Sequence, residues 1–188
     1  MALLPVFLRL EARPVLVVGG GPVAAGKLGA LVEAGAAVTV VAPAIRPEMD
    51  RPGVTLRRRA FEDADLEGVW YVVAAAPPEV NRRVHAAAER RRVFVNAVDD
   101  PAHATAFMGG VVRRAGVTVA ISTDGAAPAL AGLLREGIDA CLPPDLEAWM
   151  RVAGTAREGW RRDGVPMDER RPRLLAALNQ LYERRTAS

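Results

Sequence analysis

Short, valine-rich apolar runs alternate with longer mixed segments along the first half of the chain. Such runs are too hydrophobic to face water on either side, which is typical of strands in a parallel sheet covered on both faces. The predicted strands are 15–18, 37–42, 54–56, 68–76 and 93–95. Residues 23–34 and 78–92 have the composition and spacing of helices. The alternation predicts a doubly wound, Rossmann-like α/β domain over about residues 1–110.

The pattern changes in the second half of the chain. Residues 111–122 contain two strand-like runs with a turn between them, which predicts a hairpin rather than a further strand–helix–strand unit. A helix is predicted over 128–140, and amphipathic helices over about 146–160 and 173–184. These parts are too small to fold alone, so we expect a partner subunit to complete them.

A glycine-rich turn follows the first predicted strand and precedes the first predicted helix. Gly19, Gly21 and Ala24 form a G-x-G-x-x-A pattern. The first glycine allows a tight turn, the second lets the backbone approach a pyrophosphate, and the alanine keeps the helix close to its strand. The helix N-terminus then points at the phosphates. The pattern predicts dinucleotide binding; a turn that serves only close packing is the alternative.

The residues after the second predicted strand leave the choice of dinucleotide open. Many dinucleotide-binding folds place an acidic residue about 20 positions past the glycines to hold the ribose hydroxyls. Here that place is Val41, Ala42, Pro43 and Ala44, without an acid. Either backbone groups hold the ribose, or Arg46 lies near a 2′-phosphate, so the residues alone do not decide between NAD and NADP.

Composition excludes several classes of protein. An apolar content of 51% with 25% charged residues is that of a folded globular chain. With Cys141 as its one cysteine, the chain has no disulfide framework or thiolate zinc site, and two histidines do not make a metal cage. The N-terminal apolar run is broken at Arg9 before it reaches export or membrane length, so we expect a cytoplasmic protein that does not associate with a membrane.

Charge is the second constraint. The net charge is +3 and the isoelectric point is near 9.7, with arginine clusters scattered among acids. Nucleic-acid binders usually concentrate basic residues on one element and interleave aromatic ones, so nucleic-acid binding is disfavoured. Most of these arginines are expected on solvated faces, and a minority could surround an acidic small molecule.

An acidic stretch follows the fifth predicted strand. Asp99 and Asp100 lie at its carboxyl end, where ligands bind in open α/β sheets. Asp99 could act as a general base towards a substrate next to the nicotinamide, but an Asp-Asp-Pro sequence is also good turn and cap chemistry. Both interpretations stay open from the residues alone. His103 is expected to be solvated, and Trp70 is expected in the core because it follows the strand periodicity.

The chain resembles the precorrin-2 dehydrogenase family, which also forms the N-terminal part of siroheme synthase. The resemblance rests on LPVFL (4–8), GGGPVA (19–24) with Lys27, NAVD (96–99), AIST (120–123) and LLRE (133–136), in this order. It implies a Rossmann domain over 1–110, a dimerisation region over 111–144, a helical region over 145–188 and a homodimer. It also implies NAD-dependent oxidation of the tetrapyrrole precorrin-2 to sirohydrochlorin in siroheme biosynthesis. Some members also insert ferrous iron as sirohydrochlorin ferrochelatases.

The resemblance assigns roles to individual residues. Asp99 matches the essential carboxylate, and Ser122 and Thr123 match a polar pair in the tetrapyrrole cleft. The cofactor-binding set, from the glycine pattern and the resemblance together, is Gly19, Gly21, Pro22, Val23, Ala24, Pro43 and Ala44. Asp124 stands where the family has a glycine, and the loop after Asp99 leaves Asp100 as a rival for the essential role. A non-catalytic NAD-sensing regulatory module is the alternative function.

Overall fold

The computed structural model describes residues 3–186 and divides into two compact units. The first comprises Met1–Met108 together with Ser122–Ala127, and the second comprises Gly109–Ile121 together with Pro128–Ser188. The division brings the short segment 122–127 to the N-terminal unit, although it follows the hairpin in sequence. Within residues 3–186 no helix is long and apolar enough to cross a membrane.

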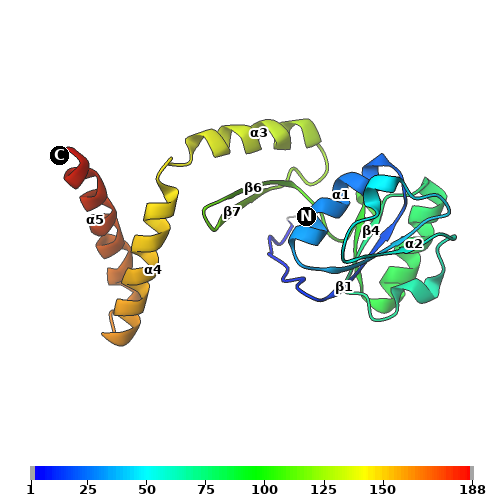
Figure 1. Cartoon of the computed structure of the whole chain (residues 1–188), viewed down its shortest axis with the longest axis horizontal. Helices are drawn as coiled ribbons and strands as arrows, with labels where there is room; N and C mark the ends of the chain where they lie inside the picture. The colour runs from blue at the N-terminus through cyan, green and yellow to red at the C-terminus, as the bar shows by residue number, and fades with distance from the viewer. Residues whose placement is uncertain (1–2, 187–188) are drawn as a thin grey trace. The chain divides into compact units, whose positions relative to one another are not determined.

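The first unit is built on a parallel sheet (Figure 1). Its strands, in the spatial order β3-β2-β1-β4-β5, are β1 (Pro14–Val18), β2 (Ala37–Val41), β3 (Val54–Arg57), β4 (Tyr71–Ala74) and β5 (Phe94–Ala97). The order reverses between β1 and β4, because the chain crosses from β3 at one edge back to the middle of the sheet. This topology confirms the predicted doubly wound α/β domain.

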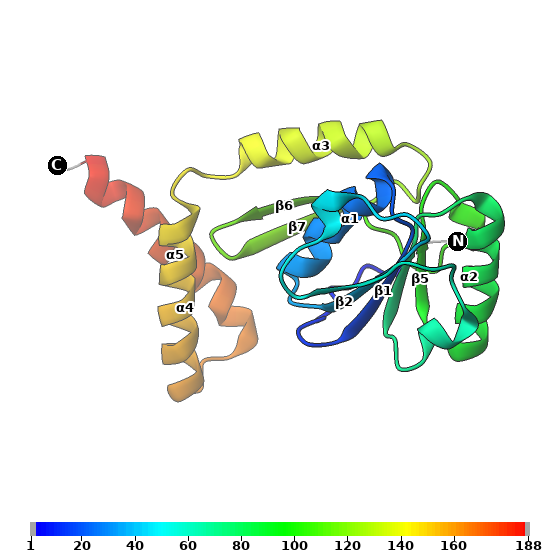
Figure 2. The same cartoon turned by 45° about the vertical axis from the view of Figure 1, so that its right-hand side comes forward.

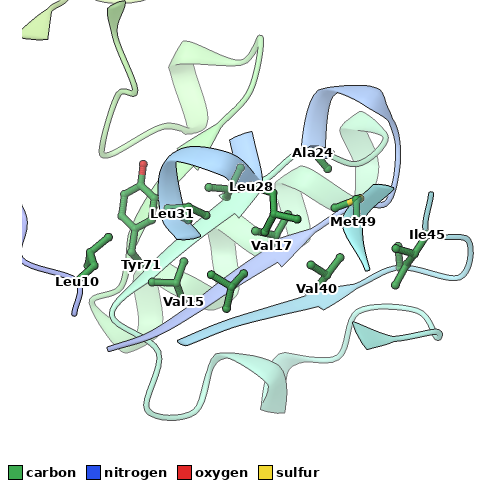
Figure 3. Packing of buried hydrophobic residues seen from close by; sticks show 13 residues of the cluster. Leu10, Val15, Val17, Ala24, Leu28, Leu31, Val40, Ile45, Met49 and Tyr71 are labelled. Atoms are coloured by element: carbon green, nitrogen blue, oxygen red, sulfur yellow. The ribbon is translucent and has the colours of Figure 1, made fainter. Parts of the chain in front are cut away.

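Helices cover both faces of this sheet. Helix α1 (Pro22–Glu33) lies on one face and α2 (Pro78–Arg91) on the other, as Figure 2 shows. Leu28 of α1 is fully buried in a cluster with Val17 and Val40 of the strands (Figure 3). Val84 of α2 is fully buried in a separate cluster. The central strands β1 and β4 are therefore covered on both sides, which explains their almost continuous runs of apolar residues, whereas β3 at the edge of the sheet alternates half-buried and exposed residues.

The prediction that Trp70 lies in the core is wrong. β4 begins only at Tyr71, because Gly68 adopts a left-handed conformation (φ 71°) and the chain is still turning at residue 70. Trp70 is 51% exposed, and the guanidinium of Arg13 lies 4.1 Å from the centroid of its ring. A cation–π contact takes the place of burial at the amino edge of the sheet.

A buried carboxylate ties β3 to the 3₁₀ turn η2 (Asp63–Leu66). The Asp65 side chain is 1% exposed and accepts hydrogen bonds from Arg57 at 3.0 Å and from Arg59 at 2.5 Å and 2.8 Å. Burial alone would raise the pKa of Asp65, but the bonds from Arg59, the Glu62 backbone N–H and Arg57 outweigh it, so the pKa lies below its ordinary value. Arg57 and Arg59, two of the three consecutive arginines at 57–59, therefore have a structural role.

The second unit contains a hairpin and helices, as predicted. β6 (Gly110–Arg114) and β7 (Val117–Ile121) pair antiparallel, and α3 (Pro128–Cys141) packs against β6, where a Cβ on Gly110 would meet the Ala131 carbonyl oxygen at 3.0 Å. α4 (Leu146–Arg162) and α5 (Met167–Thr186) form a helical hairpin. The indole N–H of Trp149 donates to the Tyr182 hydroxyl at 2.7 Å and joins the two helices. Cys141 of α3 is exposed.

Candidate functional site

The glycine turn lies at the point where the strand order reverses. Gly19 follows β1 directly with φ 131°, a conformation open to glycine, and its N–H donates to the Val41 carbonyl of β2 at 3.0 Å. On the other side, the Ala75 N–H after β4 donates to the Val18 carbonyl at 2.8 Å. A Cβ on Gly19 would lie 2.2 Å from the Ala75 carbonyl oxygen. Glycine is therefore required here by the closeness of the loop after β4.

The loop after β2 packs against the same turn. A Cβ on Gly20 would lie 1.9 Å from the carbonyl oxygen of Ala44, and the Arg46 N–H donates to the Gly20 carbonyl at 3.0 Å. Pro43 and Ala44 are both exposed at this edge. The structure thus brings two of the predicted cofactor-binding residues beside the predicted glycine turn.

Gly21 differs from its neighbours because nothing lies near it. It is the N-cap of α1 with φ −87°, and a Cβ built on it would meet no atom within 4 Å. Pro22 occupies the first turn of α1, and Ala24 is fully buried against the sheet, where it lets the helix approach its strand. The free N–H groups and the positive end of the α1 dipole therefore face open space beside Gly21, an arrangement that suits a pyrophosphate.

Asp99 lies just past the carboxyl end of β5. The register pairs Ala74 with Ala97, so Asp99 follows the strand that neighbours β4 at the same edge as the glycine turn. It is exposed and adopts a left-handed conformation with φ 57°, which is uncommon outside glycine but tolerated by aspartate. Among residues 3–186 its carboxylate has no hydrogen bond or ion pair, so it is available for contact with a ligand.

Asp100, the rival carboxylate, is already engaged. Its Oδ2 lies 2.7 Å from Nδ1 of His103, within the 3₁₀ turn η3 (Pro101–His103). The His103 ring packs edge-on against His85 of α2, with centroids 5.1 Å apart. The expectation that His103 is merely solvated is therefore wrong: the i, i+3 spacing of Asp100 and His103 was the available signal for this pair.

The segment with Ser122 and Thr123 lies beside the loop that follows Asp99. A Cβ on Gly125 would lie 3.1 Å from Cγ of Pro101 and 3.5 Å from Cε1 of Phe107. The Ser122 hydroxyl oxygen accepts from the Asp124 N–H at 3.1 Å, and that of Thr123 accepts from the Ala127 N–H at 3.3 Å. Both hydroxyls fix the turn while their own O–H groups stay available as donors.

Two buried asparagines position this edge, and the sequence analysis predicted this role for neither of them. Asn81 of α2 accepts a hydrogen bond from the Ala76 N–H at 3.0 Å, which holds the loop after β4. Asn96 of β5 donates to the Ala106 carbonyl at 3.1 Å, which holds the loop after Asp99 against the strand. Asn81 falls on the helical face that also carries the buried Val84, and a polar residue on that face was the available signal.

The fold and this edge together define the class: an α/β dinucleotide-binding protein with a carboxylate at the same sheet edge as its strand-order switch point. The family model described as "Putative NAD(P)-binding" matches residues 6–110, which is more than half of the chain. The chain belongs to this NAD(P)-binding family.

Relatives and solved structures agree with the resemblance found in the sequence. "Siroheme synthase 3" of Aeromonas hydrophila is 43% identical over 185 residues, covering 94% of this chain and 40% of that protein. "Siroheme synthase" of Citrobacter koseri is 40% identical over 173 residues, covering 89% of this chain and 38% of that protein. The chain thus spans about two fifths of the length of these curated relatives. The solved structure "SirC, precorrin-2 dehydrogenase" superposes with a TM-score of 0.69 at 25% identity, covering 93% of this chain and 88% of that one.

Proposed function

We propose that this chain is an NAD-dependent dehydrogenase that oxidises precorrin-2 to sirohydrochlorin in the cytoplasm. The observation that carries the proposal is the similarity, over nearly the full length of both chains, to a solved precorrin-2 dehydrogenase. The exposed carboxylate of Asp99 at the carboxyl edge of the sheet, which has no partner among the described residues, also supports the proposal because the reaction needs a proton acceptor. Bound at the glycine turn, NAD supplies the acceptor for the hydride that leaves the reduced macrocycle.

In this proposal, Asp99 takes the proton that leaves the substrate with the hydride. Loss of one hydride and one proton accounts for the two-electron oxidation, and a carboxylate with no other partner is suited to accept that proton. Ser122 and Thr123 hold carboxylate arms of the tetrapyrrole through their free O–H groups. The backbone N–H groups at the start of α1 hold the pyrophosphate.

The test compares the two neighbouring carboxylates. Asp99→Asn keeps a residue that tolerates the left-handed conformation, and Asp100→Asn is the matched control. With precorrin-2 and NAD under anaerobic conditions, NADH formation should fall on the order of 10²-fold or more in Asp99→Asn. Asp100→Asn should keep most of the activity. Full activity in Asp99→Asn contradicts the assigned role, and no NADH formation by the unaltered chain contradicts the proposed function.

Addition of ferrous iron to the same incubation tests ferrochelation. The resemblance implies this activity for some members only, and iron enters the reaction as a substrate. The absorbance of the product distinguishes sirohydrochlorin from siroheme. We propose ferrochelation as a second activity of the site that contains Asp99. Iron insertion removes two pyrrolic protons from the macrocycle, and a free carboxylate can accept them.

We also propose that the chain is a homodimer joined through its second unit. Leu130, Leu133 and Leu134 of α3 are 48%, 66% and 45% exposed, on a helix that covers only a two-stranded hairpin. A hairpin with one helix buries too little apolar surface to be stable alone. A second copy that covers these leucines would supply the missing burial.

A further inference from the structure

We infer that Glu48 sets the cofactor selectivity of this site: by pairing with Arg46, it makes the chain favour NAD over NADP. The inference rests on the proposed binding of a nicotinamide dinucleotide at the glycine turn. It assigns the selectivity to a residue outside the segments that the sequence marked for the cofactor. It also answers the question that the missing acid after β2 left open.

The position of Arg46 is fixed by the glycine turn itself. Its N–H donates to the Gly20 carbonyl at 3.0 Å, and the preceding residues approach so closely that a Cβ on Gly20 would meet the Ala44 carbonyl oxygen at 1.9 Å. The backbone of Arg46 therefore lies next to the glycine turn, in the loop after β2. In dinucleotide-binding α/β proteins the end of the second strand reads the adenosine ribose: an acid there binds the 2′-hydroxyl, and a nearby arginine accommodates a 2′-phosphate.

Glu48 pairs with the guanidinium of Arg46, which would otherwise be available to bind a 2′-phosphate. The Nε–H of Arg46 donates to a carboxylate oxygen of Glu48. The pKa of Glu48 is below its ordinary value, through a hydrogen bond with its own backbone and through Arg46, so the carboxylate is ionised at neutral pH. A 2′-phosphate would have to displace this carboxylate from the guanidinium edge used for bidentate recognition, and would meet its negative charge.

Two other arginines near the loop contribute a positive charge that is the same in all the Glu48 variants. Nε of Arg51 donates to the Glu48 backbone carbonyl at 2.8 Å, and Nη1 of Arg58 donates to the Ile45 carbonyl at 3.2 Å. Both remain cationic whether or not Glu48 carries a charge. The ratio of the two cofactor affinities, compared between Glu48 variants, therefore isolates the effect of the Arg46–Glu48 pair.

The experiment measures binding rather than turnover. Titration calorimetry with NAD and with NADP is carried out on the unaltered chain, Glu48→Gln, Arg46→Gln and the double variant. Glu67→Gln removes an exposed carboxylate elsewhere in the same unit and serves as the matched control. The Arg46 and Glu48 side chains are 51% and 44% exposed, so these changes should leave the fold intact.

The unaltered chain should bind NAD on the order of tenfold more tightly than NADP, because a 2′-phosphate meets the Glu48 carboxylate and an Arg46 guanidinium that is already paired. Glu48→Gln should strengthen NADP binding roughly three- to tenfold and leave NAD binding unchanged. This gain should shrink at high salt and vanish in the double variant. Glu67→Gln should not change the ratio.

Two failures are distinguishable. If the unaltered chain binds NAD but Glu48→Gln leaves the ratio of affinities unchanged, or if the gain persists in the double variant, the selectivity inference is overturned. Equal affinity of the unaltered chain for both cofactors overturns it as well. If neither nucleotide binds, the proposed function itself is refuted, and the inference with it.

Discussion

Gly20 and Gly21 are adjacent in sequence, yet the structure predicts opposite consequences for replacing them by alanine. A methyl group on Gly20 would lie 1.9 Å from the Ala44 carbonyl oxygen and 2.8 Å from the Ile45 Cα. Both contacts are with backbone, so the loop after β2 must move by about 1 Å or more to relieve them. A methyl group on Gly21 would meet nothing within 4 Å.

The magnitudes follow from these contacts. Overpacking against backbone costs about 2–3 kcal/mol, so Gly20→Ala should lower the melting temperature by about 4–12 °C for a chain of this length. Gly21→Ala changes an N-cap glycine in an ordinary extended conformation (φ −87°), so its free energy of unfolding should stay within about 1 kcal/mol of the unaltered chain. The same methyl group would stand where the pyrophosphate approaches the backbone, and NAD affinity should fall on the order of tenfold or more.

Thermal unfolding followed by circular dichroism, combined with NAD titration of each folded variant, separates the two effects. Gly20→Ala should show a stability defect, and Gly21→Ala a binding defect at nearly normal stability. An unchanged melting temperature for Gly20→Ala would contradict the close approach of the two loops. Normal NAD binding by Gly21→Ala would contradict the assignment of the open space to the pyrophosphate.

Two further predictions concern the ion-pair network and the dimer. Asp65→Asn should cost about 2–4 kcal/mol in free energy of unfolding, because it leaves Arg57 and Arg59 without their buried carboxylate partner. Since the folded-state pKa of Asp65 lies below its ordinary value of 3.8, its stabilisation is present above about pH 4 and is lost as the pH falls through the folded pKa. Denaturant unfolding should thus depend less on pH in that window for Asp65→Asn, and an unchanged dependence would contradict the network's role. Leu133→Glu should dissociate the homodimer in analytical ultracentrifugation, whereas Met167→Glu, at a 75% exposed position on α5, should not; a dimer that survives Leu133→Glu would place the interface elsewhere.

The fold of the first unit was largely predictable from the sequence, because its central strands β1 and β4 are buried on both faces and give almost unbroken apolar runs. Strand ends were less readable. β4 is shorter than its apolar run because Gly68 turns the chain before Tyr71, and β5 extends to Ala97 because Val98 still donates to the Ala74 carbonyl. α5 begins at Met167, before the predicted start at about residue 173, and the helix accommodates Pro172 in its interior.

The candidate site likewise has some features that the sequence predicts and others that it does not. The glycine turn and Asp99 follow from local pattern and strand order. The Arg46–Glu48 pair depends on how one exposed loop folds, and no periodicity marks it. Segment 122–127 belongs to the first unit because Gly125 lies close to Pro101 and Phe107. Both residues are distant from Gly125 in the sequence. These two features depend on side-chain pairing and on packing between residues distant in sequence. The pattern of apolar and polar positions along the chain predicts neither.

The outer margin of β5 is closed by the chain's own loop. Val95 donates its N–H to the Thr105 hydroxyl at 2.8 Å, and its carbonyl accepts the N–H groups of Thr105 and Ala106, both at 2.9 Å. An edge strand with satisfied backbone groups offers no template to a passing strand from another molecule. Intermolecular sheet growth at this margin would require the loop to peel away first, so the connection that carries Asp99 also guards the protein against aggregation.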